Sequence, residues 1–130
     1  MMRALPLLAL ALAAGCASFE GAAPRSGDPA ISHSITGIAS RSFDAPLARM
    51  KPIVISTLVG MGMRIAALEV KSGREFIRAK RSVDDVQIEL EPVSAMATRL
   101  RVAVRDGGGL YDSRTADRIL IEILNRLGNT

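Results

Sequence analysis

Cysteine and histidine are almost absent from this chain of 130 residues. Cys16 is the only cysteine and His33 the only histidine. A single thiol excludes a disulfide within the chain and a zinc site built from several cysteines. His33 stands between Ser32 and Ser34 with no second ligand at metal-binding spacing. We therefore expect His33 to be a solvated polar residue rather than a metal ligand or a catalytic base.

Aromatic side chains are also scarce. They make up 3% of the sequence, and tryptophan is missing. The core must therefore be aliphatic, and a platform of exposed rings for nucleobases or sugars is not expected. The methionines could suggest a soft-metal site, but core filling is the better interpretation because most fall on faces expected to be buried. These methionines are Met50, Met61, Met63 and Met96.

The apolar run near the N-terminus is too short to span a bilayer. Leu5–Ala14 holds ten residues, whereas a transmembrane helix needs about 20. Arg3 precedes the run, and Leu12-Ala-Ala-Gly-Cys16 ends it. This order resembles a bacterial lipoprotein signal, which is cleaved before the cysteine whose thiol is then lipidated. Leu12 lies one position earlier than the usual lipobox leucine. The alternative is an ordinary secretory signal that leaves Cys16 as a free thiol.

We divide the chain into a signal peptide over residues 1–15, a lipidated Cys16 with a flexible tether over 16–32, and one domain over 33–130. The tether is predicted from its Gly, Ala, Ser and Pro content. By resemblance to enterobacterial sorting, Ala17 implies the outer membrane, on its periplasmic face. Cleavage removes Arg3 and lowers the formal charge from +4 to +3. We expect membrane attachment through Cys16 and no nucleic-acid partner.

Two alternating segments, Val86–Glu91 and Thr98–Arg105, predict an antiparallel hairpin. In the favoured register Leu90 faces Leu100 and Glu89 faces Arg101. Apolar pairs then share one face and opposite charges the other, as a stable ladder requires. The other expected pairs are Ile88 with Val102, Val86 with Val104, and Glu91 with Arg99.

Apolar residues at helical spacing predict a helix from about Ala45 to Gly60 or Gly62. Asp44 is expected as its N-cap, and a left-handed glycine is expected to end it. Pro52 lies inside this helix, so we expect either a kink or a first turn followed by a restarted helix. The buried face is expected to hold Leu47, Met50, Val54, Leu58 and Met61.

Strands are predicted on both sides of this helix. Ile35–Phe43 is expected as the first strand, with a bulge or weak point at Gly37. Met63–Val70 and Arg74–Arg81 precede the hairpin, with a turn at Ser82–Asp85. That turn suggests a register with the following pairs: Ala79 with Ile88, Ile77 with Leu90, and Arg78 with Glu89.

A final helix follows, capped by Asp112 or Ser113 and ended by Gly128. Its apolar stripe is Ala116, Ile119, Leu120, Ile123, Leu124 and Leu127, with Ile121 as an exposed exception. Both helices are amphipathic and the sheet has one apolar face. The fold class is therefore α+β, a two-layer sandwich with an antiparallel sheet of about five strands and two helices on one face.

Several segments of this layout match a known pattern: Phe43–Pro46, Val59–Gly62, Val86–Val93, Thr98–Val102 and Thr115–Ile119. They resemble a family of short bacterial lipoproteins that is grouped by a domain of unknown function (number 3568). The resemblance covers roughly residues 33–127 and the lipid signal before them. The family has no established activity, so the resemblance implies an envelope lipoprotein and assigns no functional residue.

No residue set forms a convincing active site. The loop Asp106–Gly109 lacks the lysine and Ser/Thr of a phosphate loop, and we interpret it as a crossover. Asp84 and Asp85 are turn residues, while Glu89 and Glu91 face arginines, so these carboxylates are expected to be solvated. No serine or threonine can be placed beside a histidine that would act as its general base, so nucleophilic catalysis has no support. We expect neither enzymatic activity nor a cofactor.

The outer face of the sheet is the main candidate surface. It is expected to carry Arg64, Arg78, Lys80, Arg99, Arg101 and Arg105, against Glu89 and Glu91. One interpretation is a solvated face partly neutralised by cross-strand pairs. The other is a docking face for acidic groups, either an envelope protein or acidic lipid head groups. Leu68 and Phe76 are expected to share this face, which would favour a protein.

Three functional hypotheses follow. The first is a non-enzymatic, lipid-anchored interaction module of the cell envelope. The second is a periplasmic carrier of a lipid or other small apolar ligand, which needs a cavity between sheet and helices. The third is an enzyme, for which the chain lacks a constellation of catalytic residues.

Overall fold

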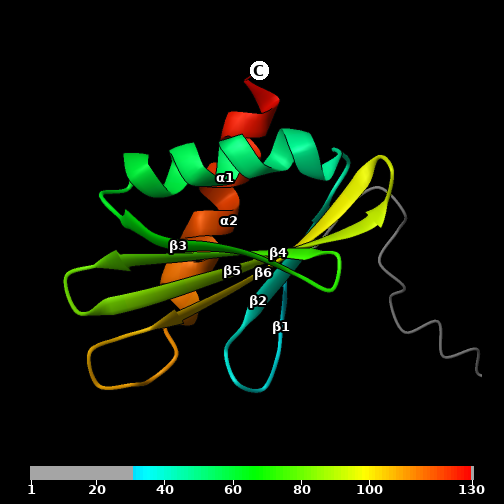
Figure 1. The fold of residues 1–130 in the computed structure, drawn as a ribbon. Helices are drawn as coiled ribbons and strands as arrows, with labels where there is room; N and C mark the ends of the chain where they lie inside the picture. Colours follow the sequence, from blue (N-terminus) through cyan, green and yellow to red (C-terminus); the bar gives the residue numbers. More distant parts are fainter. Residues whose placement is uncertain (1–30, 130) are drawn as a thin grey trace, which may run out of the picture.

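The computed structural model describes residues 31–129, which form one sheet and two helices (Figure 1). The elements are β1 (Ser32–His33), β2 (Ala39–Phe43), α1 (Leu47–Gly60), β3 (Arg64–Lys71), β4 (Arg74–Arg81), β5 (Asp84–Ser94), β6 (Ala97–Arg105) and α2 (Ser113–Gly128). All strand pairs are antiparallel, in the order β1-β2-β6-β5-β4-β3. The α+β sandwich is confirmed, with six strands rather than about five.

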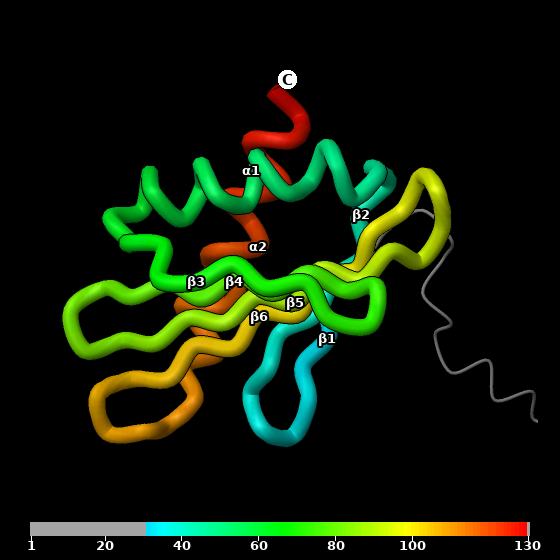
Figure 2. Tube along the Cα trace, viewed as in Figure 1, coloured from blue at the N-terminus to red at the C-terminus, as the bar shows by residue number. Residues whose placement is uncertain are grey.

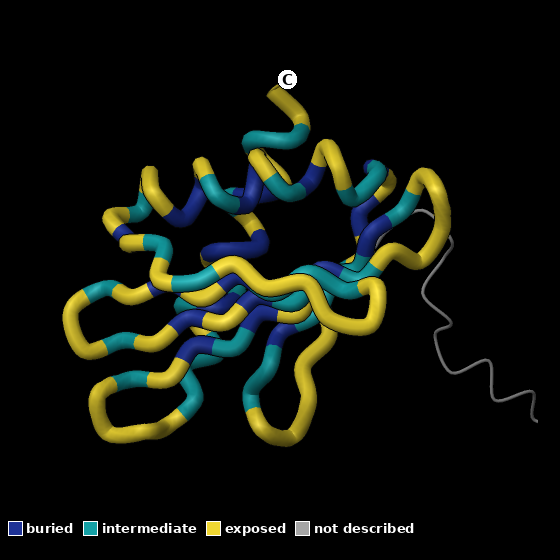
Figure 3. Tube along the Cα trace, in the orientation of Figure 1, coloured by how far each residue is buried: buried dark blue, intermediate teal, exposed yellow. Residues whose placement is uncertain are grey.

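The β5–β6 hairpin forms in the predicted register. Leu90 pairs with Leu100 and Glu89 with Arg101, and every other expected pair is present. Val86, Ile88 and their apolar partners are buried beneath the helices. Figure 3 shows buried and exposed positions alternating along these strands. Complementary pairing on both faces therefore fixes this register.

The predicted β4–β5 register is wrong by two residues. Ile77 pairs with Ile88, Ala79 with Val86, and Arg78 with Gln87. The turn contains only Ser82 and Val83, because Arg81 pairs with Asp84, and Ser82 has a positive φ of 53°. A shift of two residues preserves the faces of the sheet, so the apolar pattern alone does not distinguish the two registers.

The N-terminal strand is shorter than predicted. Residues 34–38 form the turn between β1 and β2, and Gly37 takes a positive φ of 88° there. Ser34 and Ile38 close this turn through a backbone hydrogen bond of 3.0 Å. Gly37 is thus a turn residue rather than a bulge. β2 lies beside β6, which brings the first and last long strands together (Figure 2).

The first helix begins later than predicted. Asp44 is not its N-cap; Pro46 holds that position without a side-chain cap, and its carbonyl accepts from the backbone of Arg49 and Met50. The helix is a single element through Pro52, so a restarted helix is excluded. Gly62, with a φ of 82°, follows its end as predicted.

One aliphatic core lies between the helices and the inner face of the sheet. Met50, Val54 and Leu58 of α1 are fully buried. The buried residues of α2 are Ala116, Ile119, Leu120 and Ile123, and Ile121 is exposed as expected. Within residues 31–129, neither helix is long and apolar enough to cross a membrane.

Candidate binding face

We call the sheet surface that neither helix covers the outer face. Strand alternation places its side chains opposite the core: Phe76, Arg78 and Lys80 on β4 alternate with the buried Ile77 and Ala79. All six predicted cations lie on this face. Its full set of charges comprises the cations Arg64, Lys71, Arg74, Arg78, Lys80, Arg99, Arg101 and Arg105 and the acids Glu69, Asp85, Glu89 and Glu91. Cations therefore outnumber acids on the outer face.

Four of these charges form a central ion-pair cluster: Arg74, Glu89, Glu91 and Arg101. Arg74 donates to Glu89 at 2.7 Å and lies 3.7 Å from Glu91. Arg101 lies 3.7 Å from Glu89 and 4.0 Å from Glu91. The Glu89 side chain is only 16% exposed, so its charge is largely satisfied within the cluster. The middle of the outer face is therefore close to neutral.

The expected pair between Arg78 and Glu89 does not form, because the two-residue register shift places Phe76 opposite Glu89. Glu89 interacts instead with Arg74, two residues away from Phe76 on β4, and with Arg101. Among the described residues, no ion pair or hydrogen bond involves the side chains of Arg64, Arg78 or Arg99. We call these three residues the unpaired arginines. They leave positive charge on both sides of the neutral cluster.

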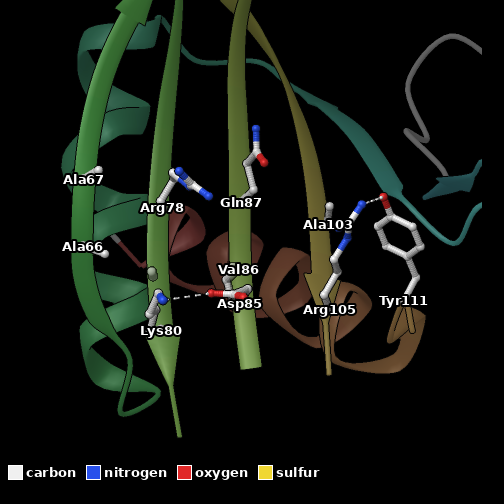
Figure 4. A pocket seen from close by; sticks show the side chains of 11 residues that line it. Ala66, Ala67, Arg78, Lys80, Asp85, Val86, Gln87, Ala103, Arg105 and Tyr111 are labelled. Atoms are coloured by element: carbon white, nitrogen blue, oxygen red, sulfur yellow. Dashed lines mark hydrogen bonds and ion pairs between the residues drawn. The ribbon is translucent and has the colours of Figure 1, made fainter. Parts of the chain in front are cut away.

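A hollow of about 400 Å³ lies on the outer face beside this cluster (Figure 4). Its floor follows one row of paired residues, in which Arg78 lies between Ala67 and Gln87, and Gln87 pairs with Ala103. A bulge between Ile65 and Ala67 brings Ala67 to this position. The two alanines leave space that longer side chains surround.

Tyr111 closes one side of the hollow, a contribution that sequence periodicity did not indicate. It forms an isolated β-bridge with Arg105. The Arg105 guanidinium donates to the Tyr111 hydroxyl at 3.0 Å and lies 5.0 Å from the ring centroid. This hydrogen bond raises the pKa of Arg105. On the other side of the hollow, Lys80 lies 3.5 Å from Asp85.

The predicted apolar pair on the outer face is only half present. Phe76 lies on this face, opposite Glu69 and Glu89. Leu68 pairs with Ile77 and therefore points toward the helix side, where it is 52% exposed at the sheet edge. The bulge after Ile65 reverses the alternation that placed Leu68 beside Phe76.

His33 has an acidic partner that the sequence did not reveal. Its Nε2 atom lies 2.6 Å from a carboxylate oxygen of Asp117 on α2. This contact attaches the edge strand β1 to the helix layer. His33 is exposed, as predicted for a solvated polar residue, and it also has this specific partner. Residues 31–129 contain no group of three or more His, Cys, Asp or Glu side chains that could hold a metal ion.

The glycine-rich loop is organised by its own aspartate. Asp106 accepts hydrogen bonds from the backbone of Gly108 at 2.9 Å and of Leu110 at 3.0 Å. A carboxylate thus already takes the amides that an anion would need, which fits the interpretation as a crossover. At the end of this loop, Asp112 caps α2, as one of the two predicted alternatives, by accepting from Thr115.

Comparison with known proteins finds no matching family model and no curated protein with significant similarity. The resemblance to the lipoprotein family therefore stays a prediction. Cys16, the predicted lipidation site, and its tether lie outside the described residues, apart from the tether's last two positions.

Proposed function

We propose that this protein is a lipid-anchored, non-enzymatic component of the cell envelope that binds an acidic partner through the outer face. The anchor is the lipid on Cys16, and the location is the periplasmic face of the outer membrane. The observation that carries this proposal is the position of the unpaired arginines on a sheet surface that no helix covers.

Electrostatics support binding over a purely solvated role. A solvated face gains little from charge beyond what keeps the protein soluble, and exposed ion pairs contribute only about 0–1 kcal/mol each. Here Glu89 and Glu91 form ion pairs with Arg74 and Arg101. The unpaired arginines remain available for carboxylates or phosphates, which guanidinium groups bind through two parallel hydrogen bonds.

Core packing favours docking over the carrier hypothesis. A cavity wide enough for an acyl chain would give its lining accessible surface. The large side chains between sheet and helices have essentially none: Met50, Val54, Leu58, Ile77, Val86, Ile88, Leu90, Leu100, Val102, Ile119, Leu120 and Ile123. The hollows that lie on the outer face are instead open to solvent.

In-cell crosslinking tests the proposal directly. Lys71 and Lys80 lie on the outer face, so an amine-reactive crosslinker reports on this surface. The test variant carries Arg78→Ser and Arg99→Ser. The matched control carries Arg114→Ser and Arg118→Ser, which remove the same charge from exposed positions on α2.

We expect mass spectrometry to identify one dominant crosslinked component in the wild type. The outer-face variant should lose it, the α2 variant should keep it, and the unanchored Cys16→Ser protein should lose it as well. Equal recovery from both arginine variants would contradict docking through the outer face.

A further inference from the structure

The hollow differs from the rest of the outer face because alanine side chains form part of its floor, whereas long cationic side chains surround it. Ala67 and Ala103 stand at the ends of the row through Arg78 and Gln87. Figure 4 shows Arg78 extending toward Gln87 on one side of the hollow, and Arg105 directed toward Tyr111 on the other side. A group that enters here lies between the two guanidinium ions.

The charge of the hollow is unbalanced. Its lining contains Arg78, Lys80 and Arg105 but only one carboxylate, Asp85, so its formal charge is +2. Asp85 lies against Lys80, and Arg105 uses one of its donors for Tyr111. Arg78 has no partner within the described residues. Most N–H donors of the Arg78 and Arg105 guanidinium groups therefore have no hydrogen-bond acceptor within the described residues.

The spacing of these donors suits a tetrahedral oxyanion. β4 and β6 are separated by one strand, so their backbones lie about 10 Å apart, a span that two arginine side chains can close onto one group. A phosphodiester has two non-bridging oxygens, as a carboxylate does, and each of them can accept from one guanidinium. A phosphodiester differs from a carboxylate in its two ester substituents, which can carry hydroxyl groups on either side of the charge. The Gln87 amide and Tyr111 hydroxyl remain for neighbouring hydroxyl groups.

We infer that this hollow binds the phosphate of an anionic glycerophospholipid headgroup. The inference rests on the proposed function, because a lipid on Cys16 would keep the domain at a bilayer. Fourteen residues separate Cys16 from Ile31, and a chain of this length can reach at most about 50 Å. Headgroups are therefore present at high local concentration, and the +2 charge complements a phosphodiester.

The test uses full-length lipidated protein in a non-ionic detergent and measures binding calorimetrically at fixed ionic strength. The probes are dihexanoyl-phosphatidylglycerol, dihexanoyl-phosphatidylcholine, glycerol phosphate and acetate. Arg78→Gln is the test variant. Arg118→Gln is its matched control, since it removes the same charge from an exposed position on α2, away from the outer face.

We expect dihexanoyl-phosphatidylglycerol to bind the wild type, with affinity lost about tenfold or more in R78Q and changed less than about twofold in R118Q. The Nε–H resonances of Arg78 and Arg105 should shift on binding. Equal losses in the two variants would indicate general attraction and overturn the inference, as would acetate binding of equal strength. If glycerol phosphate binds and the lipid does not, the ligand is a free phosphate ester, and the assignment to a lipid headgroup is wrong.

Failure of this inference is separable from failure of the proposed function. If the lipid probe does not bind but Arg99-dependent crosslinking to an envelope protein persists, the outer face docks a protein and the phosphate site is wrong. If neither occurs, both proposals fail.

Discussion

The cap of α2 offers a sharp test of how the loop beside the hollow is held. Asp112 accepts from the Thr115 backbone at 3.1 Å and from the Thr115 hydroxyl at 2.6 Å. Its own backbone donates to the Val104 carbonyl at 2.8 Å. The cap thus connects the start of α2 to the end of β6, directly after Tyr111. Asp112→Ala removes both side-chain hydrogen bonds and leaves the backbone contact in place.

The expected cost follows from the cap geometry. Loss of an aspartate N-cap costs about 0.5–2 kcal/mol, and a cap that engages two donors belongs in the upper half, at about 1.5 kcal/mol. For a domain of this size, 1 kcal/mol corresponds to about 4–8 °C in Tm. We therefore expect the Tm of Asp112→Ala to fall by about 6–12 °C at pH 7 in a thermal circular-dichroism experiment. Asp112→Asn should lose much less, because its amide oxygen also accepts.

The same measurement has a pH dependence of defined sign. The hydrogen bonds from Thr115, the hydroxyl first, lower the pKa of Asp112 from its ordinary value of 3.8. Its stabilising effect is thus complete above about pH 3.8 and is lost as the pH falls through the lower folded-state pKa. The Tm difference between wild type and Asp112→Ala should shrink there. A difference that stays constant between about pH 6 and pH 2.5 would refute this account of the cap.

Three further perturbations test the packing. Thr98→Val leaves the buried Ala45 carbonyl without the 2.8 Å bond from the threonine hydroxyl, and urea unfolding should show a loss of about 1–2 kcal/mol, whereas an unchanged midpoint would contradict this role. Pro52→Ala restores a helical N–H donor inside α1, so we expect the Tm to rise. Alanine also gives the unfolded chain more conformational entropy than proline, which offsets the gain by about 0.4–1 kcal/mol. A lower Tm would show that the helix is adapted to proline. His33→Ala breaks the contact with Asp117, so amide hydrogen exchange in β1 should accelerate. The free energy of unfolding should change by less than about 1 kcal/mol. Unchanged exchange would show that this contact does not hold β1 in place.

The sequence predicts the fold well wherever local patterns and pairing agree. The β5–β6 register followed from apolar partners on one face and opposite charges on the other. The β4–β5 register did not, because two alternatives preserve the faces and the choice depends on the backbone of Ser82. A serine with positive φ carries no distinctive sequence signal, whereas glycine or asparagine would have indicated the shorter turn.

The candidate site was predicted in part. Alternation placed all six cations on the outer face, because the assigned faces were correct for β4, β5, β6 and the part of β3 before its bulge. The hollow depends on two features that periodicity cannot supply. The bulge in β3 moves Ala67 beside Arg78, and a loop outside any regular strand brings Tyr111 to Arg105. Long-range contacts of this kind, like that between His33 and Asp117, require the tertiary fold.

The pairing of β2 with β6 has a consequence for the order of folding. Ala39 pairs with Val102, roughly sixty residues further along the chain, whereas β3 to β6 pair with their neighbours in sequence. The meander of four strands can assemble from local contacts, but β2 finds its place only after the last strand exists. A chain emerging N-terminus first therefore leaves β2 without its β6 partner until synthesis is nearly complete. In that interval the only sheet neighbour of β2 among the described residues is the two-residue strand β1, so this part of the sheet forms last.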